Sequence, residues 1–147
     1  MRVSQVEDFF AYECAVRFKE EVHRLVLASP EAYRDFKYRC QLWEAADGIE
    51  SHISEGFYRG NPSEFSNFLR YALGSLAEAV RRVRSGISRE YLREPDCKVA
   101  LMWAERCSGA TRGLKASQDR EAARRRSARR RPRNTGRSRR SGFVHSP

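Results

Sequence analysis

The strongest constraint on the fold lies in residues 62–85. Eight apolar residues in this segment are spaced by three, one, three, four, three, one and three positions. At 100° per residue they fall in a single stripe about 100° wide, which is the pattern of an amphipathic helix with one buried side. We therefore predict a helix over 62–85. Its buried stripe is Phe65, Phe68, Leu69, Ala72, Leu76, Ala79, Val80 and Val83, with Phe68, Leu69 and Leu76 the residues expected to be buried most clearly.

Three further helices are expected over 3–28, 31–55 and 95–115. Ser29 and Pro30 start the second of these, because a serine cap followed by proline is a common helix beginning. No segment alternates apolar and polar residues, so no sheet is expected. The predicted fold is all-α: an up-down-up-down four-helix bundle formed by residues 1–118. The apolar sides are Phe10, Val22, Leu25 and Val26 in the first helix, Tyr38, Leu42, Ala45, Ala46, Ile49 and Ile53 in the second, and Val99, Met102, Trp103, Ala110 and Leu114 in the last.

The charge of the chain is concentrated in its last segment. Residues 119–147 hold 11 basic and 2 acidic residues, a net charge of +9, whereas residues 1–118 hold 18 basic and 17 acidic residues, a net charge of +1. The segment has almost no apolar content, so burial cannot offset the entropy lost on ordering it. We predict a disordered Arg-rich tail over 119–147 that attracts polyanions, above all nucleic acid.

Arginine dominates the basic residues, since only four of the 29 are lysines. Arginine suits bidentate phosphate contacts. A GC-rich genome, which supplies arginine codons, explains the same ratio equally well. No aromatic residue is interleaved with the tail arginines before Phe143, so base stacking by the tail is expected to be minor.

The stretch ISEGFYRGNPSEF, residues 53–65, contains two glycines, a proline and three charged side chains. We interpret it as a turn between antiparallel helices and not as an active-site loop. Gly56 is expected to close the preceding helix in the left-handed conformation, and Gly60 to give the chain freedom before the Asn61 cap. A carboxylate of the turn is expected to hold Arg59 or a loop amide. The structural residues of the turn are therefore Glu55, Gly56, Arg59, Asn61, Pro62 and Glu64.

No catalytic, metal or cofactor site is expected. Glu20 and His23 have the Glu-x-x-His spacing of di-iron bundles, but such a site needs a second pair and two further glutamates, so a surface pair is the preferred interpretation. His52 is conceivable as a general base, yet no nucleophile is arranged with it, and a histidine near a helix C-terminus is the better explanation. The chain also lacks a Gly-rich phosphate-binding motif. We therefore predict that the protein is not an enzyme.

Residues 41–78 carry a family resemblance. They resemble the signature of the bacterial four-helix-bundle family related to the proteins encoded in intervening sequences of 23S rRNA genes, and depart from it at Glu44, Gly48 and His52. The resemblance is strong over about forty residues, and the tail lies outside it. The matching positions are Gln41, Ala45, Ala46, Ile49, Ile53, Glu55, Gly56, Arg59, Glu64, Phe65, Phe68, Leu69, Ala72, Gly74, Ser75, Leu76 and Glu78.

The resemblance implies a four-helix bundle that assembles as a ring, often of five subunits. Some relatives are accessory proteins of diversity-generating retroelements, where a basic ring contacts nucleic acid and a reverse transcriptase. Gly74 fits a ring, because a glycine within a helix costs about 1 kcal/mol relative to alanine, and close approach of another chain would compensate for it. We expect a homo-oligomer, a pentamer, with Tyr71, Gly74, Ser75 and Glu78 at the subunit contact.

Two functions are compatible with these features. The leading hypothesis is a non-enzymatic, oligomeric module that binds RNA or DNA non-specifically, in a salt-dependent way. The alternative is an oligomeric protein-interaction scaffold, for example a reverse-transcriptase accessory subunit. The expected nucleic-acid contacts are Arg81, Arg82, Arg84, Arg124, Arg125, Arg126, Arg129, Arg130, Arg131 and Arg133.

The compartment is expected to be the cytoplasm. Cys14, Cys40, Cys97 and Cys107 form no CxxC pair, which favours reduced, small apolar residues over a disulfide framework or a zinc site. The polar, acidic N-terminal segment is not typical of a signal peptide. No apolar run approaches the roughly 20 residues needed to span a membrane, so no membrane contact is expected.

Overall fold

The computed structural model describes residues 5–130, apart from the side chain of Asp8, and this part of the chain is all-α. Residues 5–130 contain no strand, which confirms the predicted fold class. The helices are α1 (Phe10–Ala28), α2 (Pro30–Arg34), α3 (Phe36–Tyr58), α4 (Pro62–Ser88) and α5 (Lys98–Arg130), with short 3-10 turns η1 (Val6–Asp8) and η2 (Glu94–Cys97) before α1 and α5.

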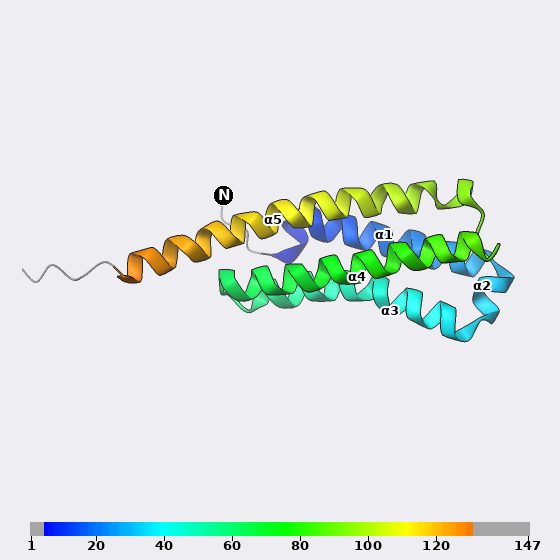
Figure 1. Ribbon diagram of the computed structural model, residues 1–147, viewed down its shortest axis with the longest axis horizontal. Helices are drawn as coiled ribbons and strands as arrows, with labels where there is room; N and C mark the ends of the chain where they lie inside the picture. Colours follow the sequence, from blue (N-terminus) through cyan, green and yellow to red (C-terminus); the bar gives the residue numbers. More distant parts are fainter. Residues whose placement is uncertain (1–4, 131–147) are drawn as a thin grey trace, which may run out of the picture.

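The four long helices lie side by side along the long axis of the molecule (Figure 1). Going around the molecule, α1 packs on α3, α3 on α4, α4 on α5, and α5 on α1. Each long helix therefore has two long neighbours, and the core lies between all four. Within residues 5–130, no helix combines the length and the apolarity needed to cross a bilayer.

The helix predicted over 31–55 is divided in two at Asp35. The Asp35 backbone leaves the helical conformation, with ψ at 87°, and its carboxylate accepts a hydrogen bond of 3.0 Å from the amide of Tyr38. Asp35 thus ends α2 and caps α3. Ser29 caps α2 in the same way, accepting a hydrogen bond of 3.1 Å from the amide of Ala32. A capping aspartate supplies the helix start that the periodic pattern alone did not indicate.

Two of the glycines inside helices are buried. Gly56 is a buried helical residue of α3, which continues to Tyr58, so the prediction that Gly56 closes the helix in a left-handed conformation is wrong. Gly86 is likewise buried in α4, which continues to Ser88. A Cβ atom at Gly56 would lie 2.6 Å from Phe68 Cβ, and one at Gly86 would collide with the Tyr38 hydroxyl. Both glycines allow close packing.

The predicted core faces agree with the structure for the second and third predicted helices, with two exceptions in α4. Leu69 and Leu76 are buried as predicted, but Phe68 and Val80 are only half-buried. In the first helix Phe10 is 53% exposed, and α1 begins there and not near residue 3.

The predicted apolar side of the last helix is correct only in part: Trp103, Ala110 and Leu114 pack against the core. Val99 and Met102 are exposed, whereas the buried positions of α5 include Ala100, Ala104 and Cys107. Small residues allow α5 to pack closely on its neighbours. The apolar side chains that determined the prediction remain on the outside or at the edge of the core.

Helix α5 continues well past residue 118. It ends at Arg130, so the prediction of disorder from residue 119 is wrong for residues 119–130, and the boundary at 118 does not coincide with the end of the helix. Figure 1 shows this part of α5 projecting beyond the ends of its neighbours. Residues 131–147, the remainder of the predicted tail, lie outside the described part of the chain.

Candidate nucleic-acid interface

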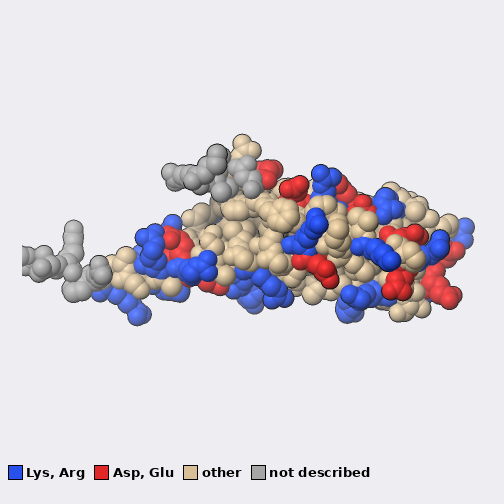
Figure 2. Space-filling model, turned by 90° about the horizontal axis from the view of Figure 1, so that it is seen from above, with Lys and Arg blue, Asp and Glu red and all other residues tan. Residues whose placement is uncertain are grey.

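The projecting end of α5, residues 119–130, is the most basic part of the described chain. It contains six arginines and two acidic residues, a net charge of +4. All six arginines are exposed, and Figure 2 shows Lys and Arg side chains gathered at this end of the molecule. We call this segment the arginine extension. Its arginines are Arg120, Arg124, Arg125, Arg126, Arg129 and Arg130.

Ion pairs within the extension engage two of its six arginines, Arg124 and Arg125. Glu121 accepts hydrogen bonds from Arg124 at 2.7 Å and Arg125 at 2.9 Å. These two guanidinium groups lower the pKa of Glu121 to about 2. Arg126 and Arg129 form no ion pair with any residue that the structure describes. The extension therefore contains both restrained arginines and arginines available to an anionic ligand.

Two of the three arginines predicted on α4 lie on a groove. Arg81 and Arg84 are exposed and line a space of about 440 Å³ between α4 and α5, together with Arg112 of α5. The rest of the lining is largely apolar and includes Leu73 and Leu101. Sequence reasoning missed Arg112, because it requires the correct register of α5. That register could have been found from the small residues Ala100, Ala104 and Cys107 instead of the large apolar ones.

Arg82 differs from its two neighbours. Its guanidinium donates to Gln41 of α3 at 2.7 Å and to Glu78 at 3.0 Å, and its side chain is only 20% exposed. The structure therefore places Arg82 in a contact between α3 and α4. A polyanion would have to displace these bonds to reach it.

The turn residues form a compact structural unit. Asn61 caps α4, accepting hydrogen bonds of 2.8 and 3.2 Å from the amides of Ser63 and Glu64, and Pro62 occupies the first turn. Arg59 donates to Glu55 at 2.7 Å. Gly60, with φ at +70°, is the glycine that adopts the left-handed conformation in this turn. The residues are arranged to join α3 to α4.

The four residues predicted at a subunit contact lie on one side of α4, but they differ in exposure and in their partners within the chain. Gly74 has no heavy atom within 4 Å of the position its Cβ would occupy, and Tyr71 is 46% exposed. Glu78 is exposed but binds Arg82. Ser75 is half-buried and faces α3, where a Cβ on Gly48 would lie 3.2 Å from its Oγ. The outward strip of α4 is thus centred on Tyr71 and Gly74.

The histidines considered in the sequence have ordinary surroundings. His23 packs on the Trp43 ring, with centroids 4.9 Å apart, and its Nε2 lies 3.4 Å from Asp47. His52 packs near the rings of Phe68 and Tyr71. Among the described residues, no group of three or more His, Cys, Asp or Glu side chains is placed to hold a metal ion.

One comparison with known proteins is positive. The model of a family described as 23S rRNA-intervening sequence protein matches residues 7–111. No curated protein matches the sequence. The matched segment contains α1 to α4 and the first part of α5. It ends before the arginine extension.

Proposed function

Because the chain belongs to the 23S rRNA-intervening sequence protein family, we propose that it is a four-helix bundle that serves as a non-enzymatic, oligomeric module for binding RNA or DNA. The observation that carries this proposal is the arginine extension: a helical segment that projects from the bundle and exposes six arginines. Family membership supports the four-helix-bundle part of the proposal, and the exposed arginines of the extension support the choice of nucleic acid as the ligand.

Phosphate groups are the natural targets of these arginines. A guanidinium donates two parallel hydrogen bonds to phosphate oxygens, and such contacts position a protein on nucleic acid without reading its sequence. A helix presents arginines at fixed spacing, so less side-chain and backbone entropy is lost on binding than from a flexible tail. Arg131 and Arg133, beyond the described residues, are proposed to add to the same contacts.

Assembly would increase the affinity further. In a pentamer, five extensions would be linked, so that each phosphate contact raises the effective concentration of the next. The exposed strip around Tyr71 and Gly74 is proposed as a subunit contact.

The proposed compartment is the cytoplasm, where the buried thiols of Cys14, Cys97 and Cys107 would stay reduced. Burial raises their pKa and so lowers their reactivity.

A charge-matched pair of triple variants tests the ligand. Changing Arg126, Arg129 and Arg130 to Gln removes three charges from the extension and keeps good helix formers. The control changes three exposed residues near the opposite end to Gln: Arg34, Lys37 and Arg93. Affinity for a labelled RNA or DNA is measured against salt concentration.

We expect the extension variant to bind more weakly. Its log–log salt slope should become shallower by up to about 3, since each lost phosphate contact removes roughly 0.7–0.9 from the slope. The control should retain the parent slope. Equal losses in the two variants would show that net charge, and not the extension, governs binding.

The groove between α4 and α5 favours the second candidate function, a protein-interaction scaffold such as a reverse-transcriptase accessory subunit. Its lining is mostly apolar and also includes Arg81, Arg84 and Arg112. Such a lining suits a protein surface better than a phosphate backbone. A chain that binds no nucleic acid, but loses a protein partner on Leu73→Lys, would favour this function.

A further inference from the structure

Three phenylalanines from separate segments meet at the end of the molecule where the arginine extension begins to project. Phe9 precedes α1, Phe57 lies in the last turn of α3, and Phe65 lies in the first turns of α4. Their ring centroids are 5.5 to 6.1 Å apart, and each pair is edge-to-face. The three rings line a pocket of about 450 Å³, a volume within the usual range for small-ligand sites.

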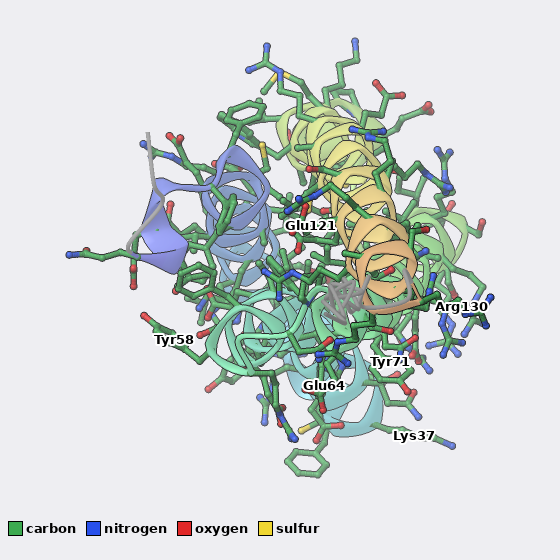
Figure 3. All side chains as sticks on the ribbon, turned by 90° about the vertical axis from the view of Figure 1, so that its left-hand side faces the viewer. Lys37, Tyr58, Glu64, Tyr71, Glu121 and Arg130 are labelled. Carbon is green, nitrogen blue, oxygen red and sulfur yellow. The ribbon has the colours of Figure 1, made fainter. Side chains whose placement is uncertain are left out.

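Helix α5, at the start of the arginine extension, forms the other side of this pocket. Gln118 and Arg125 of α5 line it together with the phenylalanines. A second, smaller hollow of about 190 Å³ shares Asn61, Pro62 and Arg125 with the first and is lined further by Arg126 and Arg129. The two hollows are therefore adjacent, one aromatic and one basic. Figure 3, an end-on view, shows the end of α3 at Tyr58, the start of α4 at Glu64 and α5 from Glu121 to Arg130 around this end.

We propose that the aromatic pocket receives one unpaired base of a single-stranded RNA or DNA, while Arg126 and Arg129 hold the adjoining phosphates. The proposal rests on the proposed function and names its ligand more narrowly. Phenylalanine rings provide stacking surfaces that accept any base, since every base has a π-face. The Gln118 amide can donate to or accept from the edge of that base.

The charge around the pocket fits this ligand. Glu121 is the carboxylate among the lining residues, and Arg124 and Arg125 bind it. Arg126 and Arg129 remain for an anion. A buried apolar peptide would leave these guanidinium groups without acceptors, whereas a nucleotide supplies a flat apolar base and a phosphate next to it. A base held in a duplex is paired and stacked, and cannot enter unless it is extruded.

The test uses the full chain and three labelled oligonucleotides: a single strand, an abasic strand with the same number of phosphates, and a duplex. Phe57→Leu removes the ring but keeps an apolar side chain. The matched control is Phe36→Leu, which removes a ring that is 68% exposed at the start of α3, away from the pocket. Binding is followed by fluorescence anisotropy.

We expect Phe57→Leu to weaken binding of the base-containing single strand by about five- to a hundredfold, the range for loss of one stacked base. Affinity for the abasic strand and the duplex should change less than twofold. Phe36→Leu should leave all three affinities unchanged. If the parent chain binds the abasic strand as tightly as the base-containing strand, the pocket proposal is wrong, while the proposed function stands.

A second readout does not depend on the variant folding correctly. A single strand with one 2-aminopurine should gain fluorescence on binding the parent chain, because a base that enters the pocket leaves the neighbouring bases that quench it, and phenylalanine is a poor quencher. Fluorescence that stays at the level of the free single strand overturns the proposal, as would a change in sedimentation with Phe57→Leu that shows the pocket to be occupied by a second copy. If none of the three oligonucleotides binds, the proposed function fails, and this inference fails with it.

Discussion

Ser66 donates a hydrogen bond to the carboxylate of Asp119, 53 residues later, and this contact joins α4 to α5 where the arginine extension begins. Ser66 is buried, and Lys115 donates to the same carboxylate at 3.0 Å. The two donors, Ser66 first, lower the pKa of Asp119. The extension thus projects from an anchored residue, and Ala122, one turn later, is still buried.

We therefore predict that Ser66→Ala loosens the extension. It should raise the pKa of Asp119 toward the ordinary aspartate value and cost about 0.5–1.5 kcal/mol of unfolding free energy, the usual net worth of one hydrogen bond. Urea denaturation and an NMR titration of Asp119 measure the two effects. Ser117→Ala, at an exposed position of α5, the helix that carries Asp119, is the control and should change neither quantity. An unchanged Asp119 pKa would show that this contact does not form in solution.

Acid should weaken the ion pairs of the extension. The pKa of Glu121 is lowered to about 2 by Arg124 and Arg125. A lowered folded-state pKa means that the stabilisation is complete above the ordinary glutamate pKa, and is lost as the pH falls from there through about 2. Amide exchange of residues 122–130 should therefore speed up over that range, after correction for intrinsic rates. Glu121→Gln should abolish this pH dependence, and high salt should reduce it, because the pairs are exposed.

Gly56 and Gly74 should respond to alanine in opposite directions. A Cβ at Gly56 would lie 2.6 Å from Phe68 Cβ and 2.8 Å from Phe65 Cδ2, whereas a Cβ at Gly74 would meet no atom within 4 Å. Gly56→Ala should destabilise the chain by about 1–3 kcal/mol, since overpacking separates α3 from α4. Gly74→Ala should stabilise the separate, monomeric subunit by up to about 1 kcal/mol through helix propensity. Thermal or urea unfolding of the two variants, measured side by side, compares the two glycines. A stabilised Gly56→Ala would mean that the helices are less close than described.

Leu76 should be an important core residue even though it borders the groove between α4 and α5. It is 4% exposed. Leu76→Ala should cost about 2–5 kcal/mol, because the removed atoms leave a cavity that the core closes only partly. Val99→Ala, at a 45% exposed position, should cost well under 1 kcal/mol. Urea unfolding compares the two variants, and a small loss at Leu76 would contradict the orientation of α4.

The sequence was most informative where a helix buries large apolar side chains. The spacing of apolar residues in 62–85 identified α4 and most of its buried face. Leu69, Ala72 and Val83 lie on that face, and the opposite face has no equally apolar residues. Phe68 shows the limit of that argument. It lies at the edge of the stripe, and its ring packs beside His52 and Tyr71 at the surface and not in the core.

The sequence was least informative for α5. Its buried residues are small, so hydropathy selected Val99 and Met102, which are exposed. The arginine-rich segment resembled a disordered tail because its own composition offers little to bury. The contacts that extend the helix, Asp119 with Ser66 and Ala122 with the core, depend on residues far away in the sequence. The aromatic pocket escaped notice for the same reason, since Phe9, Phe57 and Phe65 come together only in three dimensions.

The last prediction concerns assembly. Gly74 is an exposed glycine within the long helix α4 and has an open surface around it. If a second subunit packs there, a tryptophan would separate the two chains, whereas the helix itself has room for the larger side chain. We expect Gly74→Trp to dissociate the oligomer without loss of helix content, as measured by sedimentation and circular dichroism. Gly109→Trp provides a matched control, because Gly109 is also helical, exposed and free of atoms within 4 Å, but lies on α5. That variant should keep the parent sedimentation coefficient.

Dissociation should also weaken nucleic-acid binding, since linked arginine extensions act together and separate ones do not. A parent chain that sediments as a monomer at high micromolar concentration would contradict the prediction, as would a Gly109→Trp variant that dissociates equally.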